Sequence, residues 1–323
     1  MSDWLVSPAE IEDAARSLRG IVIRTPLLPA PWLEEVVGAE VRLKCENLQR
    51  GGAFKIRGAY TMLSRLPDLV RRRGVITYSS GNHAQAVALA ARLFGLPAVV
   101  VMPTTAPAVK VEGARRLGAE VVFEGTTSIE RKVRAEALAA ERGLAIIPPF
   151  DHPDIIAGQG TVGLEILEDW PDVDAVLVPV GGGGLLSGVA AWVKRARPSC
   201  VVVGVEPEAA DAMRRSIRAG GPVTIEPRPT IADGLMPVRP GDLTFEHARA
   251  LVDDFVTVEE EAIAEATARL LEQARLVVEP SGAATVAALL SGRFQPRGRR
   301  IAVVLSGGNL SLSPPTFALP SQV

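Results

Sequence analysis

Short apolar runs alternate with amphipathic stretches along most of the chain after Pro31. The runs are rich in Val, Ile and Leu and nearly continuous, which is typical of parallel strands buried on both faces. The expected strands are 41–45, 75–79, 97–102, 120–124, 144–148, 174–180, 201–206 and 300–306. Between them the spacing of apolar positions predicts helices, for example 84–94, 108–118 and 185–196. This alternation predicts an α/β fold with parallel sheets covered by helices on both faces.

The expected strands fall into two groups along the chain. The four consecutive strand–helix units from about 52 to 146 are expected to form one small sheet, and the pieces before and after them a second, larger one. We therefore expect a small domain at 52–146 and a discontinuous large domain made of 1–51 and 147–323. The stretch Ser7-Pro8-Ala9-Glu10 predicts a helix start with a capping box. The Pro- and Gly-rich segment 219–243 predicts a long functional loop.

The composition of the 323-residue chain fits a well-packed globular protein and argues against several other classes. The formal net charge is −2, and no basic stripe favours a nucleic-acid surface. No apolar run approaches the roughly 18 residues that a membrane span needs. The two cysteines, Cys45 and Cys200, lie far apart, which argues against a disulfide scaffold and suits a reducing compartment. Because the N-terminus also lacks a signal-peptide pattern, we expect a cytoplasmic protein without nucleic-acid or membrane partners.

The stretch LVPVGGGGLLSGVAAW, 177–192, is the strongest local indication of function. An apolar strand ends at Val180, the glycines Gly181 to Gly184 follow, and a helix begins near Leu185. Successive glycines let backbone N–H groups converge, and a helix N-terminus adds partial positive charge, so the stretch predicts an anion site suited to a phosphate. A tight turn is the plain alternative, but one glycine would suffice for it.

The glycine stretch departs from both common nucleotide-binding motifs. A dinucleotide fold has a small residue where Leu186 stands, although Glu206, at the end of the next strand, resembles the acidic ribose ligand. A P-loop needs Lys and Ser or Thr after Gly188, where Val189 and Ala190 stand. A small phosphate monoester therefore fits better. A nucleotide-binding regulatory protein that uses the glycine loop and Glu206 is the alternative from a different functional class.

Two further strand ends are rich in glycine and polar residues. In TYSSGNHAQAVALAA a polar turn opens a helix, whose free N–H groups, hydroxyls and amide suit a substrate carboxylate. Plain N-capping by Ser80 or Asn82 is the alternative, and His83 by itself is more often structural than catalytic. In VVLSGGN a strand of the buried type ends at Ser306, and a mere turn explains that stretch equally well.

The stretch ENLQRGGAFKIRGAY, 46–60, has Lys55 between the apolar Phe54 and Ile56 and behind two glycines. Lysine normally stays in water, so this position is unusual. Desolvation disfavours the charged amine, lowers its pKa and makes it a nucleophile of the kind that forms Schiff bases. A phosphate monoester that also has an aldehyde would occupy the lysine and the glycine loop together. The two features jointly predict pyridoxal 5′-phosphate as the cofactor.

These stretches resemble the motifs of the serine/threonine dehydratases, the β-family or fold type II of pyridoxal-phosphate enzymes. The lysine stretch is similar to that family's lysine signature, and SSGNH, AGQGT, GGGG, TIADG, VEPSG and SGGN follow in the family's order over roughly residues 15 to 312. The resemblance implies two open parallel-sheet α/β domains, as in the tryptophan synthase β fold, with the cofactor in the cleft between them. It also implies cofactor binding by the large domain and a homodimer.

The resemblance further implies roles for individual residues. Lys55 is implied to form the Schiff base with the cofactor and to act as the catalytic base. The other implied cofactor-binding residues are Phe54 and Glu279 beside the ring, Asn82 at the 3′-oxygen, Ser306 at the pyridine nitrogen, and Gly181, Gly182, Gly183, Gly184 and Leu185 around the phosphate. The residues implied to hold the substrate carboxylate are Ser79, Ser80, Asn82 and His83.

Two positions bear on activity and metal binding within that family. Typical threonine dehydratases resemble SAGNH, whereas serine racemases resemble SSGNH and use the second serine, here Ser80, as an acid/base opposite the lysine. The loop PVRPGDLTFE, 237–246, resembles the dehydratase form instead. Racemase relatives bind a divalent cation through the Glu of V-E-P and a downstream Asp. Glu206 matches the first, but Ala212 stands at the second with Asp211 one residue early, so Glu206 is only a candidate ligand.

We therefore expect a pyridoxal-phosphate dependent ammonia-lyase (dehydratase) that acts on a small β-hydroxy amino acid. The expected substrates are L-threonine and/or L-serine, and the expected products are 2-oxobutanoate or pyruvate plus ammonia. Serine racemase activity, possessed together with or instead of dehydratase activity, is the alternative within the family. Ser80 would then be the second catalytic residue.

Overall fold

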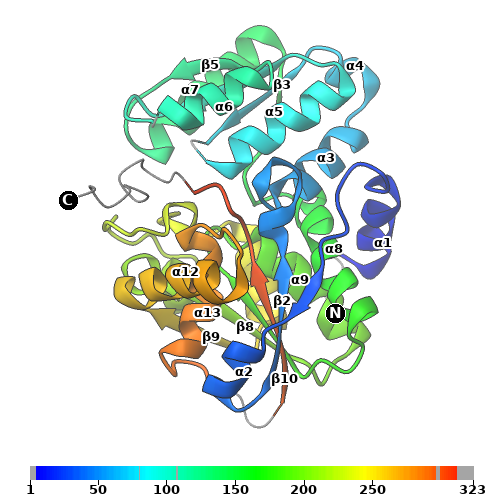
Figure 1. The fold of residues 1–323 in the computed structure, drawn as a ribbon. Helices are drawn as coiled ribbons and strands as arrows, with labels where there is room; N and C mark the ends of the chain where they lie inside the picture. The colour runs from blue at the N-terminus through cyan, green and yellow to red at the C-terminus, as the bar shows by residue number, and fades with distance from the viewer. Residues whose placement is uncertain (1–4, 80, 107, 296–298, 311–323) are drawn as a thin grey trace, which may run out of the picture.

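Two sheets organise the chain in the computed structural model, which describes residues 5–79, 81–106, 108–295 and 299–310 (Figure 1). The six-stranded sheet has the order β1 (Leu27–Pro29), β2 (Glu40–Cys45), β10 (Arg300–Leu305), β7 (Ala175–Pro179), β8 (Val201–Pro207) and β9 (Asp254–Val258). The four-stranded sheet has the order β5 (Glu120–Phe123), β4 (Ala98–Met102), β3 (Val75–Tyr78) and β6 (Ala145–Ile146). All pairings are parallel except that of β1 with β2.

Helices cover both faces of each sheet. They are α1 (Pro8–Ser17), α2 (Pro31–Val37), α3 (Lys55–Arg65), α4 (Asp68–Arg71), α5 (Asn82–Phe94), α6 (Ala108–Arg116), α7 (Ser128–Arg142), α8 (Pro153–Asp169), α9 (Gly184–Ala196), α10 (Ala212–Ala219), α11 (Asp242–Leu251), α12 (Glu260–Ala274) and α13 (Pro280–Leu290). On the large sheet, α2, α12 and α13 pack on one face, and α8, α9 and α11 on the other. On the small sheet, α3, α5 and α6 lie opposite α7.

The central strands explain why their sequences are continuously apolar. In β10, Val303 packs into the core beneath α12 and α13, whereas its neighbours Ala302 and Val304 pack into the core beneath α8 and α9. Every side chain of such a strand is buried, so no polar alternation remains. Helix α3 lies where the parts built on the two sheets meet (Figure 1). The first residue of α3 is Lys55.

The expected α/β class with parallel sheets is confirmed, and the eight expected strands are all present with bounds within two residues. Two strands, β1 and β9, were not expected, and β1 pairs antiparallel with β2 at the edge of the large sheet. Both are edge strands that are partly exposed, so neither has a continuous apolar run. The capping box at Ser7 and Glu10 is confirmed. The segment 219–243 is indeed loop apart from the ends of α10 and α11 and one 3₁₀ turn, Asp233–Leu235.

None of the helices in the described part of the chain combines the length and the apolar character that crossing a bilayer requires.

Candidate active site

The two glycines before Lys55 allow a close approach of the chain to the end of β10. Gly51 and Gly52 have φ of 75° and 73°, in the left-handed region that favours glycine. A Cβ on Gly52 would lie 2.1 Å from the Asn309 side-chain oxygen. Immediately afterwards the Phe54 N–H donates to the Ser306 carbonyl at 3.1 Å. Lys55 therefore begins α3 directly beside the strand end that contains Ser306.

Lys55 is the lysine that the sequence predicted to be desolvated. Its Nζ donates to the Pro149 carbonyl at 2.8 Å and lies 5.1 Å from the centre of the Phe54 ring. Within the described residues no carboxylate forms an ion pair with it. Burial, without a compensating negative charge, lowers the pKa of Lys55 to about 8. Near physiological pH a minority of such an amine is neutral and thus nucleophilic, but this fraction is far larger than for an ordinary lysine.

The glycine loop joins β7 to α9 and cannot accept side chains. A Cβ on Gly182 would lie 2.1 Å from the Phe150 ring, and one on Gly183 would lie 2.6 Å from the Met213 methyl group. Gly183 has a φ of 95° and stands at the N-cap of α9, where no side chain caps the helix. The first N–H groups of α9, including that of Leu185, are therefore open to an anion.

Glu279, Asn82 and Ser306 come together although they are far apart in the sequence. Asn82 Nδ2 donates to Glu279 Oε1 at 2.5 Å, and Asn309 Nδ2 donates to Asn82 Oδ1 at 2.8 Å. Glu279 lies so close to Gly307, the neighbour of Ser306, that a Cβ there would be 2.1 Å from its carboxylate. Burial raises the pKa of Glu279 to about 7, although the Asn82 hydrogen bond opposes the shift.

The predicted carboxylate loop is described only in part, because Ser80 lies outside the described residues. Ser79 Oγ accepts the Gly81 N–H at 3.2 Å. The His83 side chain is buried, with Nε2 3.0 Å from the Ile147 carbonyl, and burial together with the nearby Lys55 charge lowers its pKa to about 3. A neutral, buried imidazole offers no charge to a carboxylate. Only the backbone N–H of His83, in the first turn of α5, is suited to that contact.

Glu206, the candidate metal or ribose ligand, instead caps the start of α10. Its two carboxylate oxygens accept the N–H groups of Met213 at 2.8 Å and Arg214 at 2.9 Å. Burial raises the pKa of Glu206 to about 8, although these two hydrogen bonds oppose the shift. Among the described residues, no group of three or more His, Cys, Asp or Glu side chains is arranged to hold a metal ion.

A buried charged cluster lies behind Lys55, on the other side of the first turn of α3. We call it the charge quartet: Lys44, Glu46, Arg57 and Glu165. Arg57 donates to both oxygens of Glu46, at 2.8 Å each, and to both oxygens of Glu165, at 2.7 and 2.9 Å. Lys44 Nζ donates to Glu165 at 2.5 Å, and Thr161 Oγ1 accepts the remaining Arg57 N–H at 3.1 Å. Two cations thus balance two anions across β2, α3 and α8.

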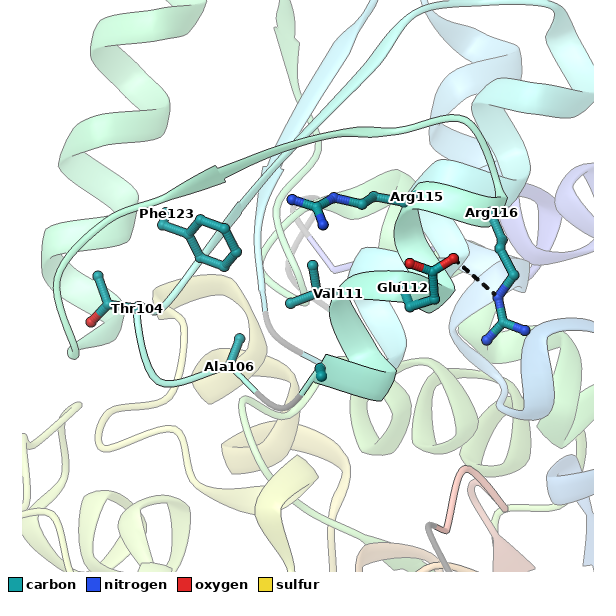
Figure 2. Close-up of a pocket in the computed structure, with 8 residues that line it drawn as sticks. Thr104, Ala106, Val111, Glu112, Arg115, Arg116 and Phe123 are labelled. Carbon is teal, nitrogen blue, oxygen red and sulfur yellow. Dashed lines mark ion pairs between the residues drawn. The ribbon is translucent and has the colours of Figure 1, made fainter.

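A surface groove on the small sheet is a separate feature. An open groove of about 640 Å³ lies between α6 and β5 of the small sheet, and Figure 2 shows Arg115, Val111 and Phe123 along it. Glu112 and Arg116 form an ion pair at its other side. No residue of the lysine, glycine-loop or Glu279 sites lines this groove.

The sequence assigned no role to several residues that support the site. Pro149, Phe150 and Asp151 belong to no motif, because they act through a backbone carbonyl, a packing surface and a helix cap. Thr244 and Asn309 stand within PVRPGDLTFE and SGGN, and those stretches were the available indications for them. Their partners, Gly182 and Asn82, are distant in sequence, so only the fold reveals the contacts.

The chain is similar to known proteins over most of its length. The profile of the family described as "Pyridoxal-phosphate dependent enzyme" matches residues 18–307. The chain is 47% identical to the L-threonine ammonia-lyase of Thermotoga maritima over 96% of this chain and 77% of that protein. It is 43% identical to the L-threo-3-hydroxyaspartate ammonia-lyase of a Pseudomonas species, over 95% and 97% of the two chains. The solved structure of maize serine racemase matches with a TM-score of 0.93 and 40% identity, over 95% of this chain and 94% of that one.

Proposed function

Because the chain belongs to the serine/threonine dehydratase family of pyridoxal-phosphate dependent enzymes, with the fold type II architecture, we propose that it is an ammonia-lyase for small β-hydroxy amino acids. The proposed reaction removes water from L-threonine and/or L-serine and releases ammonia, leaving 2-oxobutanoate or pyruvate. The single observation that supports it best is Lys55, a desolvated amine without a carboxylate partner beside an uncapped glycine loop. The ammonia-lyase names of two relatives point to the same reaction.

The described residues fit pyridoxal 5′-phosphate. Protein atoms already pack where a Cβ on Gly182 or Gly183 would stand, so only glycine fits there. The N–H groups at the start of α9, which no N-cap side chain occupies, suit a bound phosphate, and the Lys55 amine is poised for an aldehyde. We propose the following contacts to the cofactor: Gly181, Gly182, Gly183, Gly184 and Leu185 with the phosphate, Asn82 with the 3′-oxygen, Ser306 with the ring nitrogen, and Phe54 and Glu279 beside the ring. The cofactor, when bound, supplies the electron sink that makes the Cα proton of an amino acid removable.

The residues of the chain then position the substrate and move protons. Lys55 is the proposed base for the Cα proton, and its pKa of about 8 is close to the value that general-base catalysis favours at neutral pH. Ser79 and the first N–H groups of α5 are proposed to hold the substrate carboxylate, together with Ser80 and Asn82. Ser306 has a neutral hydroxyl rather than a carboxylate, so it would leave the ring nitrogen of a bound cofactor largely unprotonated. A weaker electron sink of this kind would favour elimination over transamination.

Borohydride reduction followed by mass spectrometry tests the proposal directly. We expect a pyridoxyl mass on the peptide that contains Lys55, and 2-oxobutanoate from L-threonine. Lys55→Ala should lose both, because the proposed Schiff base and the proposed removal of the Cα proton depend on the Lys55 amine. Lys132→Ala, which removes an exposed lysine of α7, is the matched control and should keep both. Normal turnover by Lys55→Ala would overturn the assignment.

Serine racemase activity is a second candidate function, favoured by the close match to maize serine racemase. Racemisation needs a proton donor on the face of the substrate opposite Lys55, and Ser80 is the proposed donor. The wild-type protein should then form D-serine from L-serine alongside pyruvate. Ser80→Ala should abolish D-serine formation and keep much of the pyruvate formation. Equal loss of both activities would assign Ser80 to carboxylate binding, and a wild type without D-serine formation would exclude the racemase.

We further propose a cytoplasmic homodimer in which 52–146 forms the small domain and 1–51 with 147–323 the large, cofactor-binding domain. The position of Lys55 between the parts built on the two sheets supports a site in the cleft between these domains. Light scattering should give twice the chain mass of 34.1 kDa. A monomeric mass would contradict the dimer. Cell fractionation tests the location.

A further inference from the structure

Three consecutive residues connect the lysine to the glycine loop. The Pro149 carbonyl accepts the Lys55 amine, and the Phe150 ring packs so tightly on Gly182 that no Cβ fits there. Asp151, the third residue, turns away from both and contacts α11. The segment Pro149–Asp151 therefore touches the amine, the glycine loop and the start of a third element. What α11 contributes to the site is not evident from its sequence.

Asp151 caps α11 although it is nowhere near that helix in sequence. Its carboxylate accepts the N–H groups of Asp242 at 3.1 Å, Leu243 at 3.0 Å and Thr244 at 3.1 Å. A side-chain carboxylate at a helix N-terminus satisfies N–H groups that have no partner within the helix. A Cβ on Gly241, just before α11, would lie 2.2 Å from Asp151, so the approach is tight. Asp151 thus fixes where the first turn of α11 stands relative to Phe150 and the glycine loop.

Thr244 extends this contact back to the glycine loop. Its side chain is fully buried, and Oγ1 donates to the Gly182 carbonyl at 2.7 Å. The Gly241 carbonyl lies farther away, at 3.2 Å, and the hydroxyl has a single proton to give. In a planar trans peptide the C=O and the following N–H point in opposite directions. Holding the Gly182 carbonyl toward α11 therefore turns the Gly183 N–H to the other side of the loop.

We propose that Thr244 is a positioning residue for the anion site. Its hydroxyl holds the Gly182–Gly183 peptide so that the Gly183 N–H faces the bound phosphate, and Asp151 holds Thr244 in place. Gly183 is the N-cap of α9 with a φ of 95°, so its N–H belongs to the helix start that has no intrahelical acceptor, and the direction of that N–H depends on how the Gly182–Gly183 peptide is held. The inference rests on the proposed function only in assigning the cofactor phosphate to the glycine loop, and it makes no use of the substrate.

The experiment compares two ligands that differ only in the phosphate. Dissociation constants of pyridoxal 5′-phosphate and of pyridoxal are measured for the full-length apoprotein, without substrate, from cofactor absorbance. The variants are Thr244→Val, which removes the hydroxyl, and Thr244→Ser, which retains it. Thr285→Val is the matched control, since Thr285 is an equally buried helix threonine whose Oγ1 donates to another backbone carbonyl, that of Val304, at 3.1 Å.

Thr244→Val should bind pyridoxal 5′-phosphate about tenfold more weakly, as expected when a buried carbonyl loses its hydrogen-bond donor. Its affinity for pyridoxal should change less than about twofold, and Thr244→Ser should bind both ligands like the wild type. Thr285→Val should lose thermal stability but keep both affinities.

If Thr244→Val weakened the binding of both ligands equally, Thr244 would be assigned to general folding and the proposal would be overturned. Unchanged binding of both ligands would also overturn it. A wild type that does not prefer the phosphorylated ligand would overturn the phosphate assignment itself, whereas absence of threonine turnover alone would affect only the proposed reaction.

Discussion

Lys55 and Arg57 are two basic residues in the same turn of α3, and they differ in their hydrogen-bond acceptors and ion-pair partners. Arg57 is fully buried, and each of its five guanidinium N–H groups has an acceptor: two oxygens of Glu46, two of Glu165 and the Thr161 hydroxyl. The Lys55 side chain points the other way, and its amine donates a hydrogen bond to the Pro149 carbonyl. Burial lowers the pKa of both side chains. At Arg57, however, Glu46 and Glu165 reverse the effect and raise the pKa, whereas at Lys55 nothing opposes it.

The contrast separates a structural charge from a reactive one. A buried ion pair that is fully hydrogen-bonded adds little net stability, but it fixes geometry because removing any member leaves a buried charge unpaired. The charge quartet can therefore hold the first turn of α3 rigidly against β2 and α8. The unpaired amine on the opposite side of that turn is then presented at a fixed place. Perturbed ionisation of this kind, in the absence of a partner, is typical of functional sites.

Arg57→Met should give the largest stability loss among the changes that test this contrast. It leaves Glu46 and Glu165 buried with only Lys44 to balance them, so the free energy of unfolding should fall by about 3–5 kcal/mol. Lys55→Met, two residues away, removes a desolvated amine with no ion-pair partner and should leave stability unchanged or raised. Urea unfolding of the two apoprotein variants measures both values. Similar losses for the two would mean that Lys55 is as structural as Arg57.

A double-mutant cycle inside the quartet should show a smaller but distinct effect. Lys44→Met and Glu165→Gln each unbalance the buried charge, whereas the double variant restores neutrality. Their coupling free energy in urea unfolding should therefore be about 2 kcal/mol. The control pair is Lys194→Met with Asp253→Asn, an ion pair with similar contact distances but partly exposed to solvent. Its coupling should stay below about 1 kcal/mol, and equal coupling in the two cycles would refute the special role of burial.

The ionisation of the Lys55 amine should determine how cofactor capture and protein stability depend on pH. Only the neutral amine reacts with an aldehyde, so the rate at which apoprotein captures pyridoxal 5′-phosphate should rise about tenfold per pH unit and level off above a midpoint of about 8. Stability should follow the same ionisation. Between pH 8 and 10.5 the unfolded chain holds a proton on Lys55 that the folded protein lacks, so the free energy of unfolding should rise with pH relative to Lys55→Met. Stopped-flow absorbance gives the capture rate, and a midpoint near 10.5 would contradict the desolvated amine.

Much of this arrangement was predictable from the sequence, for physical reasons. Central strands such as β10 are buried on both faces, so their continuous apolar runs identify them. Lys55 and the glycine loop were recognisable because each breaks a local rule: a lysine among apolar residues, and more glycines than a turn needs. The edge strands β1 and β9 are partly exposed and lack continuous apolar runs, so the sequence did not predict them.

Contacts between distant segments were not predictable. Arg57 and Glu165 look like ordinary surface charges in the sequence, because helical spacing does not reveal that α3 packs on α8. His83 has the right residue type for a carboxylate site, yet its imidazole is turned inward to Ile147, and only the fold determines that orientation. Each carboxylate oxygen of Glu206 accepts one N–H group at the start of α10, a contact that its sequence position does not indicate. In each case the side chain's partner, rather than its type, decides its role.

A substitution at Thr161 should have the smallest effect of those considered, and it tests whether the contacts of Arg57 influence the ionisation of Lys55. Its hydroxyl accepts one Arg57 N–H at 3.1 Å and donates to the Gly158 carbonyl at 2.6 Å. Thr161→Val leaves those two groups without this partner, while Arg57 keeps its bonds to both carboxylates, so the loss in unfolding free energy should be about 1 kcal/mol. Thr161→Ser should restore it.

The capture midpoint of Thr161→Val should remain at about pH 8, because Lys55 contacts neither Thr161 nor the quartet and its pKa is set by burial alone. Urea unfolding measures the effect on stability through Arg57, and the capture assay on the same preparations measures the ionisation of Lys55. If the midpoint moved together with stability, the quartet would tune the ionisation of Lys55 as well as its position. If only stability changed, the charges of the quartet would be structural, and desolvation by the surrounding apolar residues would be sufficient to make Lys55 reactive.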